Sequence, residues 1–152
     1  MEPTAGHAFR ERALRQLRAT RNYWIATTTP AGRPHSAPVW GVWLDGALWF
    51  GTEGQKAKNL AVTPYAVAHL ESGDDVVIVR GRVSRVEDAA GLERVAGAFR
   101  EKYVDGVSGE PFEVLPVIEM GAGAGLYRLD VELFHAWLEG AFEQANARWR
   151  PQ

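Results

Sequence analysis

Short runs of β-branched and aromatic residues alternate with turn residues along most of the chain. These runs predict strands at 23–29, 35–44, 47–52, 65–71 and 76–86. Later runs predict strands at 126–131 and 133–139 and a short final strand at 145–150. Asp45-Gly46, between two apolar runs, predicts a two-residue hairpin turn. The spacing therefore indicates a mostly antiparallel sheet whose neighbouring strands are joined by hairpins.

Helical periodicity is limited to three segments of the chain. One stripe of apolar residues predicts a helix at 8–19, and a second stripe predicts a helix at 88–103. A shorter helix is expected at 55–62, because Pro64 stops it, and 106–116 is expected to be a loop. Many strands beside few helices favour a mainly β (α+β) fold. We expect a closed or partly closed antiparallel barrel with two or three peripheral helices.

The composition narrows the class of protein. The 152 residues fit one domain, 1–152, and 46% hydrophobic and 24% charged residues are ordinary for a globular protein. A net charge of -2 argues against nucleic acid as a partner. The absence of cysteine excludes disulfides and thiol catalysis and suits the cytoplasm. Because no apolar run approaches the roughly 20 residues of a membrane span, we expect a cytoplasmic protein without a membrane partner.

The clearest chemical pattern is the predicted hairpin at 35–52, which runs directly into a basic helix start. A helix N-terminus has unpaired amides and a partial positive charge, so it binds phosphate readily. Lys56 and Lys58 add full charges there, and Thr52 adds a hydroxyl group. Lysines at this end oppose the helix dipole, so an anion that compensates them is the functional interpretation. The alternative is a solvated helix start whose lysines face water.

The predicted strand at 35–44 has two distinct faces. Alternation places on one face Ser36, Pro38, Trp40 and Val42, and on the other Ala37, Val39, Gly41 and Trp43. Pro38 cannot donate a ladder hydrogen bond, so we expect this strand at a sheet edge. A free edge offers backbone donors and acceptors to a planar ring. The alternative is a strand whose aromatic side chains pack in the core. We favour a core position for Trp43 and for Trp49 of the next predicted strand.

The sequence has no pattern typical of a metal site or of a protein nucleophile. The four histidines lack ligand spacing, and His69 and Glu71 on one strand face have no third ligand. Nucleophile elbows, phosphate-binding loops and dinucleotide glycine motifs are absent from the sequence. The glycine-rich segment Gly121–Gly125 is either a mobile lid or a plain linker.

Two stretches of the sequence together resemble a known group of proteins. WIATTTPAGRPHSAPVWGVWLDGALWFGT, followed by KAKNLAVTPYAVAHLESGDDVVIVRGRV, is similar to the pyridoxamine 5'-phosphate oxidase-like FMN-binding split β-barrel superfamily. The branch that it resembles most is the flavin/deazaflavin branch with F420-dependent oxidoreductases, and FHAWLEGAFEQANARWRP resembles the end of that branch. The resemblance covers roughly residues 10–150 and lies in the whole pattern rather than in one motif.

This resemblance implies a split β-barrel that forms a homodimer with two cofactor sites at the subunit interface. The residues implied to lie along an isoalloxazine-type ring are Ser36, Pro38, Val39 and Trp40. Those implied to reach the phosphate and ribityl tail are Thr52, Lys56, Lys58 and Asn59. Trp137 of the partner subunit is implied to approach the ring. In such enzymes the cofactor supplies the hydride and the protein positions it.

The implied activity is an F420- or FMN-dependent oxidoreductase that transfers hydride to a small conjugated acceptor. F420 is favoured over FMN because its long acidic tail suits a basic groove. The residues expected to supply that groove are Lys56, Lys58, Arg80 and Arg82. Pyridoxamine-phosphate oxidase activity itself is disfavoured, since Arg148 and Arg150 stand in a different context from the substrate-phosphate residues of those enzymes.

Two other classes of function remain open at the level of sequence. The first is a non-catalytic protein that binds or carries a flavin, haem or related planar ligand, because fold does not dictate activity. For haem, the candidate axial ligands are His35, His69 and His135. The second is a purely structural dimer, which leaves the paired lysines without a role.

Overall fold

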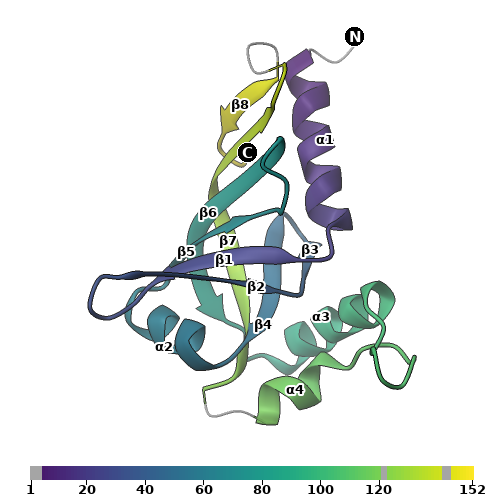
Figure 1. Cartoon of the computed structure of the whole chain (residues 1–152). Helices are drawn as coiled ribbons and strands as arrows, with labels where there is room; N and C mark the ends of the chain where they lie inside the picture. Colours follow the sequence, from purple (N-terminus) through teal and green to yellow (C-terminus); the bar gives the residue numbers. More distant parts are fainter. Residues whose placement is uncertain (1–4, 121–122, 142–144) are drawn as a thin grey trace.

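An eight-stranded antiparallel sheet forms the centre of the molecule, seen in a computed structural model (Figure 1). The structure describes residues 5–120, 123–141 and 145–152. The strands are β1 (Tyr23–Thr28), β2 (Pro34–Val39), β3 (Gly41–Leu44), β4 (Ala47–Thr52), β5 (Tyr65–His69), β6 (Asp75–Arg85), β7 (Gly125–Leu138) and β8 (Asn146–Trp149). They are ordered β2-β1-β5-β6-β7-β4-β3, and β8 pairs with β7. The curled antiparallel sheet confirms the predicted split β-barrel.

Four helices accompany the sheet in the described part of the chain. They are α1 (Ala5–Ala19), α2 (Gly54–Val62), α3 (Ala89–Lys102) and α4 (Val114–Met120). Figure 1 shows α1 beside β8 and the upper part of β6, whereas α2, α3 and α4 gather at the opposite end of the sheet. The number of helices exceeds the two or three that were predicted, because α4 begins within the segment 106–116 that was expected to be a loop. None of these helices has the length and apolarity needed to cross a membrane.

The predicted strand at 35–44 is interrupted at Trp40. The prediction of one continuous strand was wrong, because β2 pairs with β1 at one margin of the sheet and β3 pairs with β4 at the other. Because only Trp40 separates β2 from β3, the two margins of the sheet lie next to each other at this residue, where the chain crosses from one to the other. The sheet must therefore curl to bring them together. Gly41 permits this crossing, since a Cβ atom there would lie 2.9 Å from the Trp49 carbonyl oxygen. The position of β2 confirms the edge strand predicted from Pro38.

The two late strands predicted at 126–131 and 133–139 are one strand, β7, with a bulge. Its pairing with β6 shifts in register between Arg80 and Gly81, where Glu132 is the extra residue. Gly81 faces the bulge, and a Cβ atom there would lie 1.9 Å from the Asp130 carbonyl oxygen. The break in alternation that suggested two strands is therefore a bend within one strand.

Two hydrophobic clusters stabilise this arrangement. The first fills the interior of the curled sheet and includes Tyr23, Ile25, Leu48, Phe50 and Leu129, all fully buried. The second lies between the β3–β4 hairpin and α3 and α4, and its members include Val42, Trp49, Val95, Phe99 and Tyr103. Trp43 belongs to the first cluster and Trp49 to the second, which confirms the core role favoured for both. The second cluster also forms the back of the candidate site.

Candidate functional site

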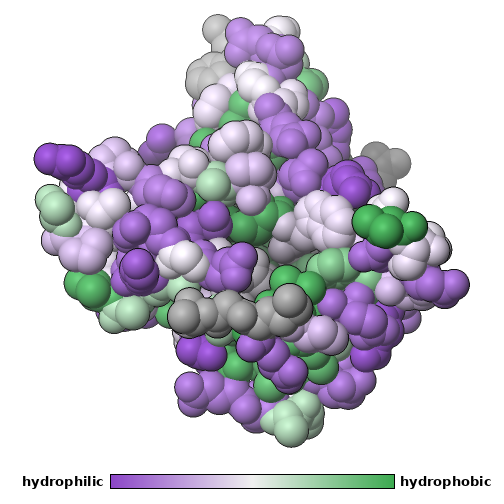
Figure 2. All heavy atoms as spheres, turned by 60° about the horizontal axis from the view of Figure 1, so that its bottom comes forward, coloured by the Kyte–Doolittle hydropathy of each residue, from purple (hydrophilic) through white to green (hydrophobic). Residues whose placement is uncertain are grey.

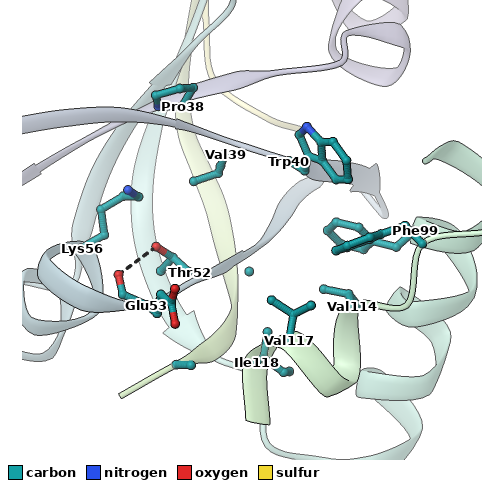
Figure 3. A pocket seen from close by; sticks show the side chains of 13 residues that line it. Pro38, Val39, Trp40, Thr52, Glu53, Lys56, Phe99, Val114, Val117 and Ile118 are labelled. Carbon is teal, nitrogen blue, oxygen red and sulfur yellow. Dashed lines mark hydrogen bonds between the residues drawn. The ribbon is translucent and has the colours of Figure 1, made fainter. Parts of the chain in front are cut away.

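A cavity of about 280 Å³ opens at the end of the sheet where α2, α3 and α4 gather (Figure 3). Its lining comes from β2, β4, α2, α3, α4 and the segments next to them, and consists of Pro38, Val39, Trp40, Gly51, Thr52, Glu53, Lys56, Phe99, Phe112, Val114, Val117, Ile118 and Ala124. Figure 2 views the molecule from this end and shows apolar side chains at the surface, among polar neighbours. The volume is at the lower end for small-molecule sites, so the cavity suits a ring-sized part of a ligand.

One end of the cavity is polar. Thr52 ends β4, and Gly54 then starts α2 at a φ of 65°, a left-handed conformation that favours glycine. This turn brings Glu53 and Lys56 to the same end of the cavity, where Figure 3 shows them on either side of Thr52. Lys56 is half-buried, and burial lowers the pKa of its ammonium group. Glu53 is the N-cap residue of α2, but its side chain accepts no capping hydrogen bond.

The other end of the cavity is apolar and is built by α3 and α4. Phe99 comes from α3, whereas Val114, Val117 and Ile118 come from one face of α4. Helix α4 packs directly on β4 at Gly51, where a Cβ atom would lie 3.3 Å from Ile118 Cγ2. Glycine at this position therefore fixes how closely the apolar wall approaches the sheet.

Trp40 forms the aromatic wall beside the margin crossing, and three neighbours hold it. Its indole stacks on the Tyr103 ring with centroids 4.5 Å apart and an interplanar angle of 7°. Phe112 meets it edge-on at 5.0 Å, and the Arg21 guanidinium lies 4.8 Å from the indole centroid. These contacts give the cavity a fixed flat surface on that side.

The end of α3 fixes the peptide group next to Trp40. The amide of Gly41 donates to the Tyr103 hydroxyl at 3.0 Å, and the Lys102 ammonium donates to the Gly41 carbonyl at 2.8 Å. Lys102 also donates to the Tyr23 hydroxyl at 2.9 Å. Because this lysine is half-buried, desolvation lowers the pKa of its ammonium group to about 8.

The structure brings five of the nine residues expected at the site to the cavity. These are Pro38, Val39, Trp40, Thr52 and Lys56. Together they join the free margin of the sheet to the start of α2, as the hairpin pattern suggested. The shared cavity is a geometric finding, and contact with a cofactor remains a prediction.

The other four expected residues lie outside the cavity lining. Ser36 and Lys58 are exposed on β2 and α2. Asn59 is fully buried, and its side chain donates to the Thr27 hydroxyl at 2.9 Å and accepts from Gln55 at 2.7 Å. These bonds give Asn59 a structural role inside the protein. Trp137 lies on β7, where it pairs with Asn146 of β8. Its expected role in a partner's site remains a prediction.

Sequence reasoning missed the residues of the apolar wall. Val114, Val117 and Ile118 have helical spacing, which was a usable signal, but Pro116 between them favoured a loop. Glu53 was also missed, because the sequence alone does not show which way an N-cap side chain points. The possible lid at Gly121–Gly125 includes residues 121 and 122, which lie outside the described residues. Of the remainder, Ala124 lines the cavity and Gly125 begins β7.

A separate groove of about 150 Å³ lies on the sheet between β5, β6, β7 and β8. Its apolar lining is Val67, Ile78 and Leu133, and its polar lining is Arg80, His135 and Arg148. Burial, and to a lesser extent Arg148, lowers the pKa of His135. Among the described residues no three histidine, cysteine or carboxylate side chains gather into a metal-binding group.

Comparison with protein families assigns the chain to a class. Residues 9–137 match the pyridoxamine 5'-phosphate oxidase family, so the chain belongs to that family. A conserved hypothetical protein from Mycobacterium tuberculosis has a solved structure with a TM-score of 0.67 and 28% sequence identity, over 84% of this chain and 82% of that chain. A search of curated proteins found no match.

Two further solved structures share the fold at lower identity. The heme binding protein from Mycobacterium smegmatis has a TM-score of 0.66 at 19% identity, over 99% of this chain and 59% of that chain. The heme storage protein HutZ from Vibrio cholerae has a TM-score of 0.63 at 20% identity, over 80% of this chain and 89% of that chain. At these identities the likeness concerns the fold alone.

Proposed function

We propose that the protein is an oxidoreductase that holds F420, with FMN as the alternative, and passes hydride to a small conjugated acceptor. The observation that carries this proposal is the composition of the cavity. A free strand margin at Pro38–Trp40 borders it, an ammonium group stands at one end, and a flat aromatic wall stands at the other. Such a cavity suits a planar polar ring with an anionic tail, and membership of the family supports the same class of ligand.

Each part of the cavity has a task in this proposal. Strand β2 pairs on one side only, so its free backbone groups are available to the donors and acceptors along a ring edge. Lys56 binds the anionic tail, and the Thr52 hydroxyl adds a hydrogen bond to it. Trp40 and Phe99 exclude water from the ring and hold it flat. The cofactor, when bound, supplies the hydride, so the lining residues need only bind and orient it.

The proposal includes a homodimer in which Trp137 of the partner subunit completes the site. A single chain offers a cavity of about 280 Å³, which is small for a whole cofactor with its tail. A second chain over the opening supplies the missing wall. This arrangement is the one that the sequence resemblance implies.

The two lysines of α2 provide a matched test of cofactor binding. Lys56 lines the cavity and Lys58, two residues further on, is exposed outside it. Lys56→Ala is expected to weaken F420 binding by about 1.5–3 kcal/mol, or roughly 10- to 150-fold, because a charged hydrogen bond to phosphate is lost. Lys58→Ala, the control, is expected to change the affinity less than threefold. Titration of the native protein with F420 and FMN comes first, and the proposal fails if neither binds.

A non-catalytic haem-binding protein is the second candidate, and the groove around His135 favours it. The low pKa of His135 keeps its imidazole neutral and able to bind iron, and Arg80 and Arg148 suit two propionates. The other candidate ligands, His35 and His69, do not line this groove. A Soret band after haem addition that His135→Ala abolishes supports this function, and no band excludes it.

A further inference from the structure

The charged groups that line the candidate cavity are balanced. Among the described lining residues, Lys56 is the cation and Glu53 is the anion, and both stand at the polar end. Lys58, the second lysine of α2, is exposed and outside the lining. An anionic group that enters this end therefore meets attraction from Lys56 and repulsion from Glu53.

These two charges act separately on a ligand. No salt bridge joins Glu53 to Lys56 among the described residues. Burial is the cause of the lowered pKa of Lys56, whereas a carboxylate in close contact would raise that pKa. The Glu53 side chain makes no capping bond to α2 that would hold it away from the cavity. Its carboxylate is therefore available to repel a ligand's phosphate.

Glu53 also competes with a phosphate for the positive end of α2. A carboxylate at the N-cap interacts favourably with the partial positive charge of a helix N-terminus. The nine-residue helix α2 begins directly after Glu53 and faces the polar end of the cavity. A ligand phosphate must share this potential with Glu53, and the resulting repulsion increases with the charge of the phosphate.

We propose that Glu53 selects for a cofactor with a singly charged phosphodiester and against one with a phosphomonoester. This inference rests on the proposed function, and it favours F420, whose phosphate is a diester, over FMN, whose phosphate is a monoester. A phosphomonoester carries about -1.5 to -2 charges at pH 7. Without Glu53, that extra charge would strengthen the attraction to Lys56. Several ångströms from a carboxylate, one further unit of negative charge costs on the order of tenfold in affinity.

Probes that share one ring isolate the effect of the phosphate. Riboflavin, FMN and the methyl phosphodiester of FMN are titrated into the protein at pH 7.5 and followed by quenching of flavin fluorescence. The corresponding deazaflavin series, with no phosphate, a monoester and a methyl diester, is titrated in the same way. The quantity compared is the affinity for the monoester divided by the affinity for the diester, so changes in ring binding cancel.

The native protein is expected to bind the diester at least as tightly as the monoester. Glu53→Gln is expected to shift the ratio about tenfold towards the monoester, while affinity for the phosphate-free ring changes less than twofold. Glu53→Ala is expected to give the same shift, and because Glu53 is exposed both variants keep the fold. Glu71→Gln removes the same charge at an exposed position in the turn before β6, away from the cavity lining, and is expected to leave the ratio unchanged.

Two different failures are distinguishable in this experiment. If the native protein binds the ring but prefers the monoester tenfold or more, or if Glu53→Gln leaves the ratio unchanged, the role of Glu53 is overturned and the proposed function stands. If no member of either ring series binds, the proposed function itself fails.

Discussion

At the scale of single residues, Lys102 has an unusual environment for a lysine. Its ammonium group donates to the Gly41 carbonyl and the Tyr23 hydroxyl and lies 4.7 Å from the Tyr23 ring centroid. Two further polar or charged side chains lie near the Lys102 ammonium group. The Tyr103 ring centroid is 5.2 Å from it, and the Arg21 guanidinium lies over the neighbouring Trp40. These contacts connect a half-buried charge to the wall of the candidate site.

Lys102 predicts a specific dependence of stability on pH. Burial lowers the pKa of its ammonium from 10.5 to about 8, so between these values the unfolded chain binds more protons than the folded protein. The free energy of unfolding should therefore rise as the pH increases from 8 towards 10. Above pH 10 the trend reverses, because burial raises the pKa of Tyr23 and of Tyr103 above the value in the unfolded chain.

Urea unfolding between pH 7.5 and 9.5 measures this dependence. Lys102→Met is expected to reduce the rise in the free energy of unfolding to the part that comes from Lys56, whose pKa is also lowered by burial. Lys58→Met, at an exposed position on α2, is expected to keep the full rise. The prediction is contradicted if the free energy of unfolding of the native protein does not rise more steeply between pH 7.5 and 9.5 than that of Lys102→Met.

At the scale of elements, the position of α4 against β4 decides the shape of the apolar wall. The two elements touch across Gly51, where an added methyl group would lie 3.3 Å from Ile118 Cγ2 and 3.5 Å from Val114 Cγ2. The contact with Ile118 is tight for a methyl group, whereas the contact with Val114 is an ordinary van der Waals distance. The short helix has seven residues, so its position depends on these contacts rather than on its own hydrogen bonds.

Gly51→Ala is expected to displace α4 and to narrow the cavity. Overpacking of this kind costs about 1–3 kcal/mol of unfolding free energy, and cofactor affinity should fall with it. Ile118→Leu moves the branched methyl group away from residue 51, so the double variant should recover part of both losses. A double-mutant cycle in urea unfolding and in F420 titration measures the coupling. Additive effects of the two substitutions would show that α4 does not rest on Gly51.

At the scale of the whole molecule, the proposed dimer makes the site depend on two chains. In analytical ultracentrifugation the native protein is expected to have a molecular mass twice the 16.8 kDa of one chain. If Trp137 of the partner subunit contacts the ring, Lys56 and Trp137 of one chain belong to different sites. When chains with a substitution at one or the other residue are mixed, both substitutions then fall in the same site of the heterodimer.

Mixed subunits test this arrangement directly. Lys56→Ala and Trp137→Ala proteins are each expected to bind cofactor weakly, because every site in either homodimer lacks one residue. A heterodimer of the two variants places both defects in one site and leaves the other site intact. Unfolding and refolding the mixture should therefore restore tight binding to about half of the sites in the heterodimers. Failure of the mixture to regain any tight sites would assign Trp137 to its own chain's site, and tight binding by the Trp137→Ala protein alone would assign it to none.

Much of the fold was predictable because its signals are local. The Asp45-Gly46 turn and the alternating strands define hairpins from neighbouring residues alone. Pro38 predicted an edge strand because its missing amide proton is a property of the residue itself. The same local logic failed at Trp40, where the strand changes partner without a turn residue, and at Glu132, where a bulge imitates the end of a strand.

The sequence by itself determined the class of fold, the sheet margin and the basic start of α2, because alternation, turn chemistry and helix starts depend on residues close together in the chain. Which of its two lysines lines the cavity was decided by the tertiary structure. Only the tertiary structure decided that Trp40 is held by Tyr103, that α4 forms the apolar wall, and that Glu53 faces the same cavity as Lys56. These features depend on contacts between distant segments, such as the bond from Gly41 to Tyr103 across 62 positions. Packing of the whole chain sets such contacts, and no local pattern encodes them.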